Sequence, residues 1–314
     1  MFARNAQEGH ARRAWLSLVM LGVLLLMVSA AWLLVRARSV PPAGAEDVLR
    51  ALREKGLRHY WPRPRERWLL LRKDGAPVGW NAAVVLPAGN GEFRGLDVTY
   101  DASSRAIVWE AWRLNADATA GDYAAGRANG RGRSLTTDTR IRYAAGRLET
   151  VQFIHGQRYA SGAEAPGNYL PEGTVPLARR IVADRESSAR FQMVIHSAPP
   201  QGDRTRLVTL TIAYAGTTPR GPLEGARQVH VSLGRTDSGV YLLDEDGDLL
   251  GAEDGGLSMT AATAAEVSQQ YGNAARLVRA LLGLSLDELG EAGDSVPLPP
   301  LTREPDAPAE ADRQ

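Results

Sequence analysis

The stretch Thr205–Tyr214, with the sequence TRLVTLTIAY, decides the fold class of this chain. Its side chains alternate between an apolar set and a mixed set that carries threonines. The apolar set is Val208, Leu210, Ile212 and Tyr214, and the mixed set is Leu207, Thr209, Thr211 and Ala213. A period of two is that of a β-strand, whose successive side chains point to opposite faces. The stretch therefore predicts a strand with one clearly more apolar face.

The same alternation recurs on both sides of this stretch. In Leu135–Tyr143 one face is apolar or carries threonine, and the other carries charged residues. Similar runs cover residues 81–86, 92–100, 105–114, 147–155, 189–196, 226–233 and 239–244. Glycine, asparagine and aspartate bound these runs, which is typical of antiparallel strands. We expect a mainly β (α+β) fold of around ten strands, forming one large curved antiparallel sheet, a partial barrel or a two-sheet sandwich.

Helical patterns flank the strand region. After residue 45, Val48, Leu49 and Leu52 share one face of a short predicted helix that ends at Gly56. Beyond Gly256 a capping-box pattern, Thr263–Glu266, precedes an apolar stripe. The stripe consists of Val267, Tyr271, Ala274, Val278 and Leu281. This pattern predicts a C-terminal helix that covers the sheet.

Residues 14–35 form a run of 22 residues without charge. A helix of this length reaches about 33 Å, enough to cross a hydrocarbon core. Trp15 and Trp32 lie near its ends, where indole rings prefer the membrane interface. A cleaved signal peptide is the alternative, but its apolar region is shorter, about 7 to 15 residues. The run therefore predicts a single-pass anchor in a bacterial inner (cytoplasmic) membrane.

Five segments follow from these patterns. They are a cytoplasmic head (1–13), the transmembrane anchor (14–35), a linker (36–45), an extracytoplasmic β-rich domain (46–290) and a disordered tail rich in proline and acidic residues (291–314). The orientation rests on the short basic head, because arginines flank the run nearly equally: Arg4, Arg12 and Arg13 before it, Arg36, Arg38 and Arg50 after it.

Composition excludes several classes of site. The net charge is +1, so no global basic field supports nucleic-acid binding. Cysteine is absent, which removes disulfides, thiolate metal sites, a catalytic cysteine and lipidation on cysteine. No G-x-S-x-G motif and no phosphate-binding loop occurs. We therefore assign no catalytic residue, no metal ligand and no cofactor.

Three local features have an ordinary structural interpretation. His155, His196 and His230 fall on predicted strands without metal-binding spacing, which indicates partly exposed strand histidines. The acidic run Asp244–Asp248 does not match a calcium loop and indicates a solvated hairpin turn. The glycine-rich stretch Gly121–Gly132 indicates a flexible exposed loop.

The tryptophans suggest a binding surface. Trp61, Trp68, Trp80, Trp109 and Trp112 all lie in the first half of the chain. Trp109 and Trp112 have opposite parity on one strand, so one can enter the core while the other meets a ligand, a helix or the membrane. The predicted ligand-binding residues are Trp109, Trp112, Val208, Leu210 and Ile212.

Two hairpins and a break divide the β-rich region into two possible halves. Residues 69–79 and 241–251 match in pattern, each with an Asp-Gly turn between apolar runs. The break, with Leu170-Pro171 and Val175-Pro176, places a boundary near 165–176. With these features the chain resembles bacterial envelope proteins of the periplasmic lipoprotein-carrier family and relatives of unknown function. That resemblance implies a half-barrel whose concave side shelters acyl chains or another apolar ligand.

Three functional hypotheses remain open at this point. The leading one is a non-enzymatic, membrane-anchored envelope protein that binds a lipid, another hydrophobic ligand or an envelope protein partner on its curved sheet. The alternative is a tethered scaffold whose core is filled by its own side chains. A hydrolase with an unrecognised site is the third, and it would require a histidine, a carboxylate and a serine to meet in a pocket.

Overall fold

The computed structural model describes residues 44–129, 135–196, 200–202, 204–220, 223–234, 237–286 and 288. All of these belong to the second of two compact units, which are Met1–Pro41 and Pro42–Gln314. The predicted head (1–13), anchor (14–35) and tail (291–314) lie outside the described residues. Within the described part, no helix combines the length and the apolar character that a bilayer crossing requires.

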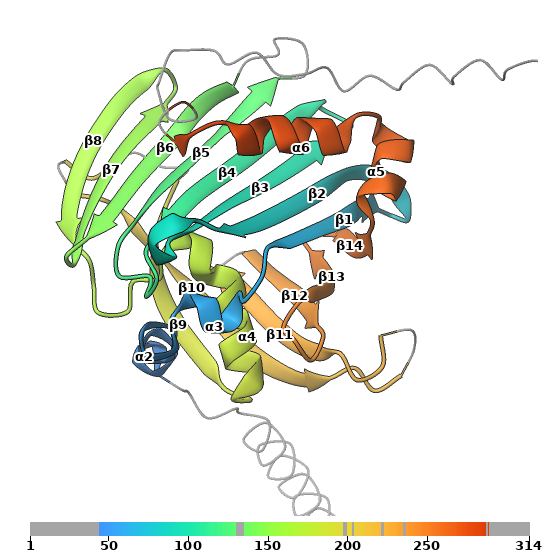
Figure 1. The fold of residues 1–314 in the computed structure, drawn as a ribbon, viewed down its shortest axis with the longest axis horizontal. Helices are drawn as coiled ribbons and strands as arrows, with labels where there is room; N and C mark the ends of the chain where they lie inside the picture. The colour runs from blue at the N-terminus through green and yellow to red at the C-terminus, as the bar shows by residue number, and fades with distance from the viewer. Residues whose placement is uncertain are drawn as a thin grey trace, which may run out of the picture. The chain divides into compact units, whose positions relative to one another are not determined.

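One antiparallel sheet of fourteen strands organises the described residues (Figure 1). Its first meander comprises β1 (Arg65–Lys73), β2 (Ala76–Pro87), β3 (Phe93–Asp101), β4 (Ala106–Leu114), β5 (Gly121–Asn129), β6 (Leu135–Ala144), β7 (Arg147–Ile154) and β8 (Gln157–Glu164). Its second meander comprises β9 (Ser188–Val194), β10 (Leu207–Thr217), β11 (Arg227–Leu233), β12 (Asp237–Leu243), β13 (Leu249–Asp254) and β14 (Leu257–Ala262). The two meanders join where β14 pairs with β1. The prediction of one large antiparallel sheet is confirmed, and the sheet is not closed.

The glycine-rich stretch Gly121–Gly132 was expected to be a flexible loop, and that prediction is wrong. Most of it forms β5, which pairs with β4 and β6. At a bulge next to Gly126, a Cβ atom would lie only 1.8 Å from the carbonyl oxygen of Thr136. The small residues therefore permit a close approach between strands rather than flexibility.

Both predicted Asp-Gly hairpins are present. Asp74 and Gly75 have φ values of 51° and 78° in the β1–β2 turn, as a tight hairpin turn requires. Gly247 has a similar positive φ of 81° in the β12–β13 turn. His155 was expected on a strand, but it occupies a similar position with a φ of 53°, in the turn between β7 and β8. The reason is the adjacent Gly156, which makes His155-Gly156 a turn pair.

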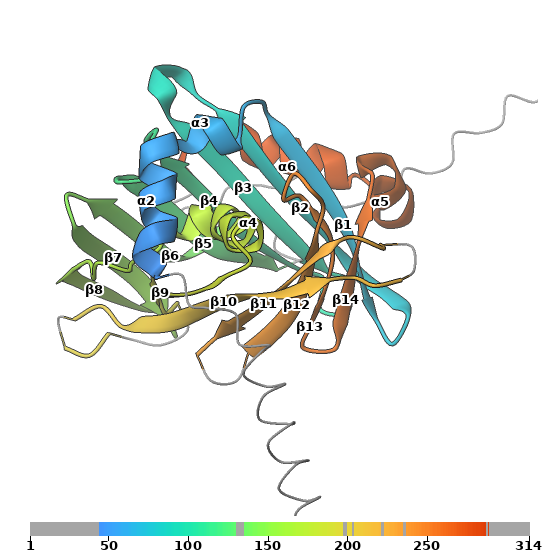
Figure 2. The ribbon, with the colours of Figure 1, turned by 90° about the horizontal axis from the view of Figure 1, so that it is seen from below.

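Helices cover both faces of the sheet, which curves around α4 (Figure 2). On the concave side lie α2 (Ala45–Lys55), α3 (Leu57–Tyr60) and α4 (Val175–Asp184), together with the short 3-10 helix η2 (Glu172–Thr174). The convex side carries α5 (Ala264–Tyr271) and α6 (Ala274–Gly283). A second short 3-10 helix, η1 (Gly89–Gly91), connects β2 and β3. Each face thus has its own apolar core.

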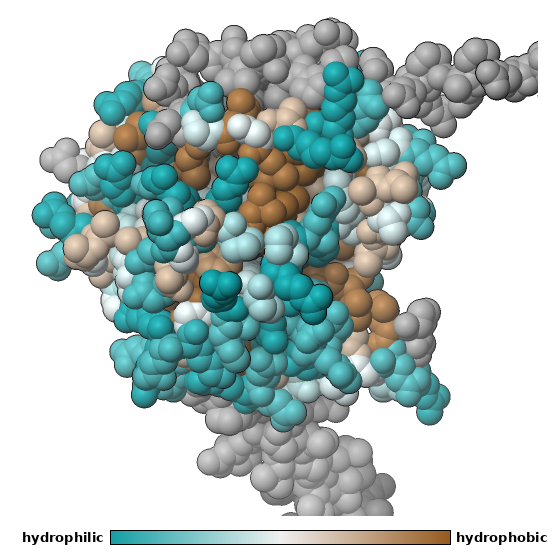
Figure 3. All heavy atoms as spheres, viewed as in Figure 1, coloured by the Kyte–Doolittle hydropathy of each residue, from teal (hydrophilic) through white to brown (hydrophobic). Residues whose placement is uncertain are grey.

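The C-terminal cover differs in one detail from the predicted helix. Thr263 and Glu266 form the expected capping box at the start of α5. Gly272, with a φ of 76°, then ends α5, and α6 begins at Ala274. Hydrophobic residues show between α6 and the strands beneath it, whereas most of the remaining visible surface is hydrophilic (Figure 3).

Side chains hold the two edges of the sheet together. Thr150 Oγ1 lies 3.1 Å from Thr205 Oγ1, and Ser161 Oγ lies 3.0 Å from the same atom. Gln152 Nε2 donates a hydrogen bond of 2.8 Å to the carbonyl oxygen of Ile195. These contacts link β7 and β8 to the segments that flank β9 and β10. We call this set of contacts the seam.

We expect Leu277→Ala in the full chain to lower the free energy of unfolding by about 2 to 5 kcal/mol, because it empties a buried position on the face of α6 that packs on the sheet. Arg276→Ala, at an exposed position of the same helix, is the matched control. Urea denaturation measures both. Equal, small effects of the two substitutions would show that α6 does not pack on the sheet as described.

Candidate functional site

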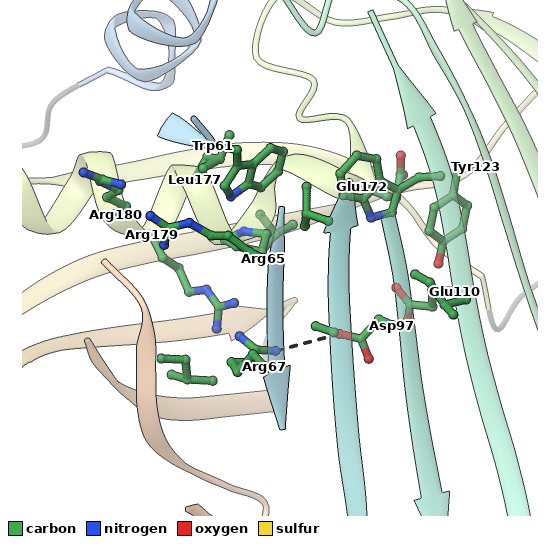
Figure 4. A pocket seen from close by; sticks show the side chains of 18 of the residues that line it. Trp61, Arg65, Arg67, Asp97, Glu110, Tyr123, Glu172, Leu177, Arg179 and Arg180 are labelled. Carbon is green, nitrogen blue, oxygen red and sulfur yellow. Dashed lines mark ion pairs between the residues drawn. The ribbon is translucent and has the colours of Figure 1, made fainter. Parts of the chain in front are cut away.

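A cavity of about 470 Å³ lies between the concave face of the sheet and α4 (Figure 4). Aromatic and aliphatic side chains from both meanders, from α4 and from the segment before β1 form much of its wall. They are Trp61, Val85, Trp112, Leu177, Met193, Val194, Val208, Leu243 and Leu249. A volume of this size falls within the range of about 300 to 1,000 Å³ that is usual for small-molecule pockets.

Strand register places a row of charged residues on the cavity floor. Arg67, Ala83, Asp97 and Glu110 are successive cross-strand partners on β1, β2, β3 and β4. Directly opposed residues project from the same face of an antiparallel sheet. Because Ala83 is small, Arg67 can reach across it, and its Nη2 atom lies 3.9 Å from Asp97 Oδ2. Asn81 supports the pair, since its amide donates to Asp97 and its Oδ1 accepts from Arg67.

Two glutamates that line the cavity, Glu110 on β4 and Glu172 on η2, have raised pKa values. Loss of hydration raises the pKa of Glu110 to about 7, and the neighbouring Asp97 charge adds to this shift. The Tyr123 hydroxyl opposes the shift by a hydrogen bond to Glu110. Burial also raises the pKa of Glu172 to about 7, against hydrogen bonds from the Tyr169 hydroxyl (2.7 Å) and the Val194 amide. Both glutamates can therefore exchange protons near neutral pH.

Arginines gather on the other side of the cavity. Arg179 of α4 is only 8% exposed, and its guanidinium carbon lies 4.5 Å from the centroid of the Tyr241 ring. Burial lowers the pKa of Arg179 to about 10, so it stays charged at neutral pH. Arg65 forms an ion pair with Asp248. Figure 4 shows Arg65, Arg67 and Arg179 facing the acidic side across the cavity.

Two stacked tryptophans form an apolar wall. The rings of Trp61 and Trp112 lie 5.5 Å apart with an interplanar angle of 23°. Trp112 fits between two glycines, because a Cβ at Gly95 would lie 2.1 Å from its ring and one at Gly173 would lie 2.5 Å from it. The position of Trp112 is thus fixed by the backbone on both sides.

The histidines have separate surroundings. His196 follows β9, lines the cavity and lies 5.2 Å from the Tyr123 ring. His196 is half-buried, as predicted, but it lies two residues beyond the end of β9 and not on the strand. Burial lowers its pKa to about 4. His230 is exposed on β11, opposite in parity to the buried Val229, as expected. Within the described ranges, no three histidine or acidic residues are grouped as a metal site.

The structure separates the predicted ligand-binding residues into two groups. Trp112 and Val208 line the cavity. Trp109 belongs to the convex core, and Leu210 and Ile212 are buried in the concave core, where α4 packs against β10. The opposite parity of Trp109 and Trp112 thus places their rings on opposite faces of the sheet.

Sequence reasoning missed the charged residues of the cavity. Asp97 lies between Leu96 and Val98 on a strand whose opposite face is buried, and Glu110 lies between Trp109 and Ala111 in the same way. A charge at an inward position of a strand is a signal that can be read from the sequence. Whether these carboxylates meet Arg67 and Arg179 depends on the strand register and on the path of α4. Neither can be predicted from the sequence pattern.

Comparisons with known proteins identify no family. No protein-family model and no curated protein matches this chain. Among solved structures, it is similar to a β-barrel-like protein of a domain of unknown function, DUF1849, from Brucella abortus, with 11% identity over 63% of this chain and 93% of the other, and a TM-score of 0.44. A DUF1089 family protein from Pseudomonas aeruginosa has 15% identity over 55% of this chain and 88% of the other, with a TM-score of 0.31. The resemblance to the lipoprotein-carrier family is not confirmed.

The raised pKa of Glu110 predicts a specific pH dependence of stability. Between its ordinary pKa and about 7, the folded chain holds a proton that the unfolded chain has released, so raising the pH through this range lowers the free energy of unfolding. Glu110→Gln removes this contribution, and we expect its stability relative to wild type to increase from pH 5 to about pH 7 and then to level off.

Denaturation of the full chain at several pH values tests this prediction. Comparison with wild type is essential because His196 acts in the opposite sense: its lowered pKa favours the folded state as the pH rises. Glu149→Gln, at an exposed position of β7, is the control. Wild-type and Glu110→Gln curves that run parallel across the range would contradict the assignment.

Proposed function

We propose that this chain is a non-enzymatic binding protein whose curved sheet holds a hydrophobic or amphipathic small molecule in the cavity beside α4. The observation that carries the proposal is a cavity of about 470 Å³ with an aromatic wall and a few convergent charged groups. Such a combination is typical of ligand sites, in which apolar surface provides affinity and a few polar groups fix orientation.

The fixed position of the wall residues supports a cavity that is already formed without a ligand. Gly95 and Gly173 hold Trp112 in its slot, so the ring cannot easily move to fill the empty volume. Helix α4 covers Leu210 and Ile212 but leaves Val208 at the cavity wall. The part of the concave face under α4 is filled by the protein's own side chains, as the scaffold alternative requires. The part beside α4 is not filled in this way.

The predicted anchor at residues 14–35 belongs to the same proposal. A chain tethered to the outer side of a bacterial inner membrane would have a reservoir of apolar molecules nearby. An envelope protein partner would then be the donor or acceptor of the ligand.

Filling the cavity floor tests the proposal. We expect Ala83→Phe to abolish binding of the uncharged fluorescent probe N-phenyl-1-naphthylamine by the full chain, held in an amphipathic polymer, because the new ring occupies space between β1 and β3. Organic extraction and mass spectrometry of the same samples report any co-purified apolar molecule.

Ala160→Phe is the matched control, since it makes the same change at an exposed position of β8. It should bind the probe like wild type, and circular dichroism should show that both variants fold. If folded Ala83→Phe binds as well as wild type, the cavity is not the binding site. Absence of saturable binding by wild type would overturn the proposal itself.

A further inference from the structure

Two guanidinium groups of the cavity share a single carboxylate. Arg67 projects from β1 and Arg179 from α4, and the positive charge of each acts on Asp97. The two arginines are also close enough to repel each other. By contrast, Arg65 has its own partner in Asp248, and Arg180 has one in Asp184. The two arginines and Asp97 together therefore carry one net positive charge.

The hydrogen-bonding capacity of this pair is incompletely used. The Nε atoms of Arg67 and Arg179 are buried and have no hydrogen-bond partner in the described structure. Arg179 is nearly enclosed, and its planar group stacks on Tyr241 rather than on a carboxylate. Buried donors without an acceptor are unfavourable, so an acceptor supplied from the cavity would be stabilised there.

We propose that Arg67 and Arg179 form an anion subsite, and that the ligand is an apolar chain that ends in one carboxylate. This inference rests on the proposed function. A carboxylate can accept side-on from Nε and a terminal nitrogen of one guanidinium, and its single charge balances the excess of the pair. Arg67 and Arg179 would therefore bind such a ligand more tightly than a neutral ligand with the same apolar chain.

The rest of the cavity sets the direction of the ligand. Glu110 and Glu172 lie on the side opposite the arginines, so an anionic group is disfavoured there (Figure 4). The stacked Trp61 and Trp112 offer an apolar surface for the chain. The carboxylate end therefore lies at the arginine pair, and the apolar chain packs on the tryptophan wall.

Competition against N-phenyl-1-naphthylamine tests the subsite with three ligands of equal chain length: dodecanoate, dodecanol and dodecyl phosphate. On the full chain at pH 7.5, we expect dodecanoate to displace the probe at a concentration about tenfold or more below that of dodecanol, as a charge-assisted hydrogen bond implies. Equal displacement by the two would overturn the subsite while the proposed function stands. Tighter binding of dodecyl phosphate would overturn the single-charge assignment.

Two substitutions give opposite expected effects. Arg179→Gln should weaken dodecanoate about tenfold and leave dodecanol unchanged. Asp97→Asn should strengthen dodecanoate, because it removes the internal carboxylate that competes for both arginines, and a gain in affinity cannot arise from misfolding. Arg190→Gln, which removes an exposed charge on β9, is the control and should change neither. An unchanged preference for dodecanoate in both Arg179→Gln and Asp97→Asn would refute the inference, and failure of every ligand to bind would refute the proposed function.

Discussion

The register of strands β1 to β4 is the constraint on which the rest of this structure depends. It places Arg67, Asp97 and Glu110 in one row on the concave face. Because side chains alternate along a strand, a slip of one residue would exchange the two faces completely. The charged row would then lie under α6, and Trp80 and Trp109 would enter the cavity. The apolar convex core therefore fixes the position of the charges as firmly as it stabilises the fold.

Gathering so many charges along one cavity is electrostatically unfavourable, and the raised pKa values of Glu110 and Glu172 reflect this. Asp97 and Glu110 are direct cross-strand neighbours of like charge, an arrangement that sheets usually avoid. Arg67 and Asn81 compensate Asp97, whereas among the described residues Glu110 is hydrogen-bonded by the Tyr123 hydroxyl and no cation contributes to the shift of its pKa. This imbalance beside an apolar wall departs from the usual rules of sheet stability, as functional sites often do.

Local signals in the sequence predicted the elements that depend on local chemistry. The alternation in Thr205–Tyr214 became β10, the Asp-Gly pairs became hairpin turns, and Thr263 with Glu266 capped α5. Strand β5 escaped detection because its glycines and alanines carry no apolar alternation, although backbone pairing holds it in the middle of the sheet. The charged site escaped for a different reason, since it is assembled from strands and a helix that meet only in the folded chain.

The seam between the two edges gives the cavity wall an uneven mechanical compliance. Along the rest of the sheet, neighbouring strands are joined by continuous ladders of backbone hydrogen bonds. Among the described residues, the contacts of β7 and β8 across the seam are made by side chains, and backbone hydrogen bonds to Gln192 of β9 come from the segment that follows β8. Ile195, whose carbonyl accepts from Gln152, also lines the cavity. Widening the cavity there breaks a few hydrogen bonds made by side chains and leaves the ladders between paired strands intact. The wall is therefore stiffer beneath the charged row than at the seam, so the cavity can change its width there while the strands stay paired.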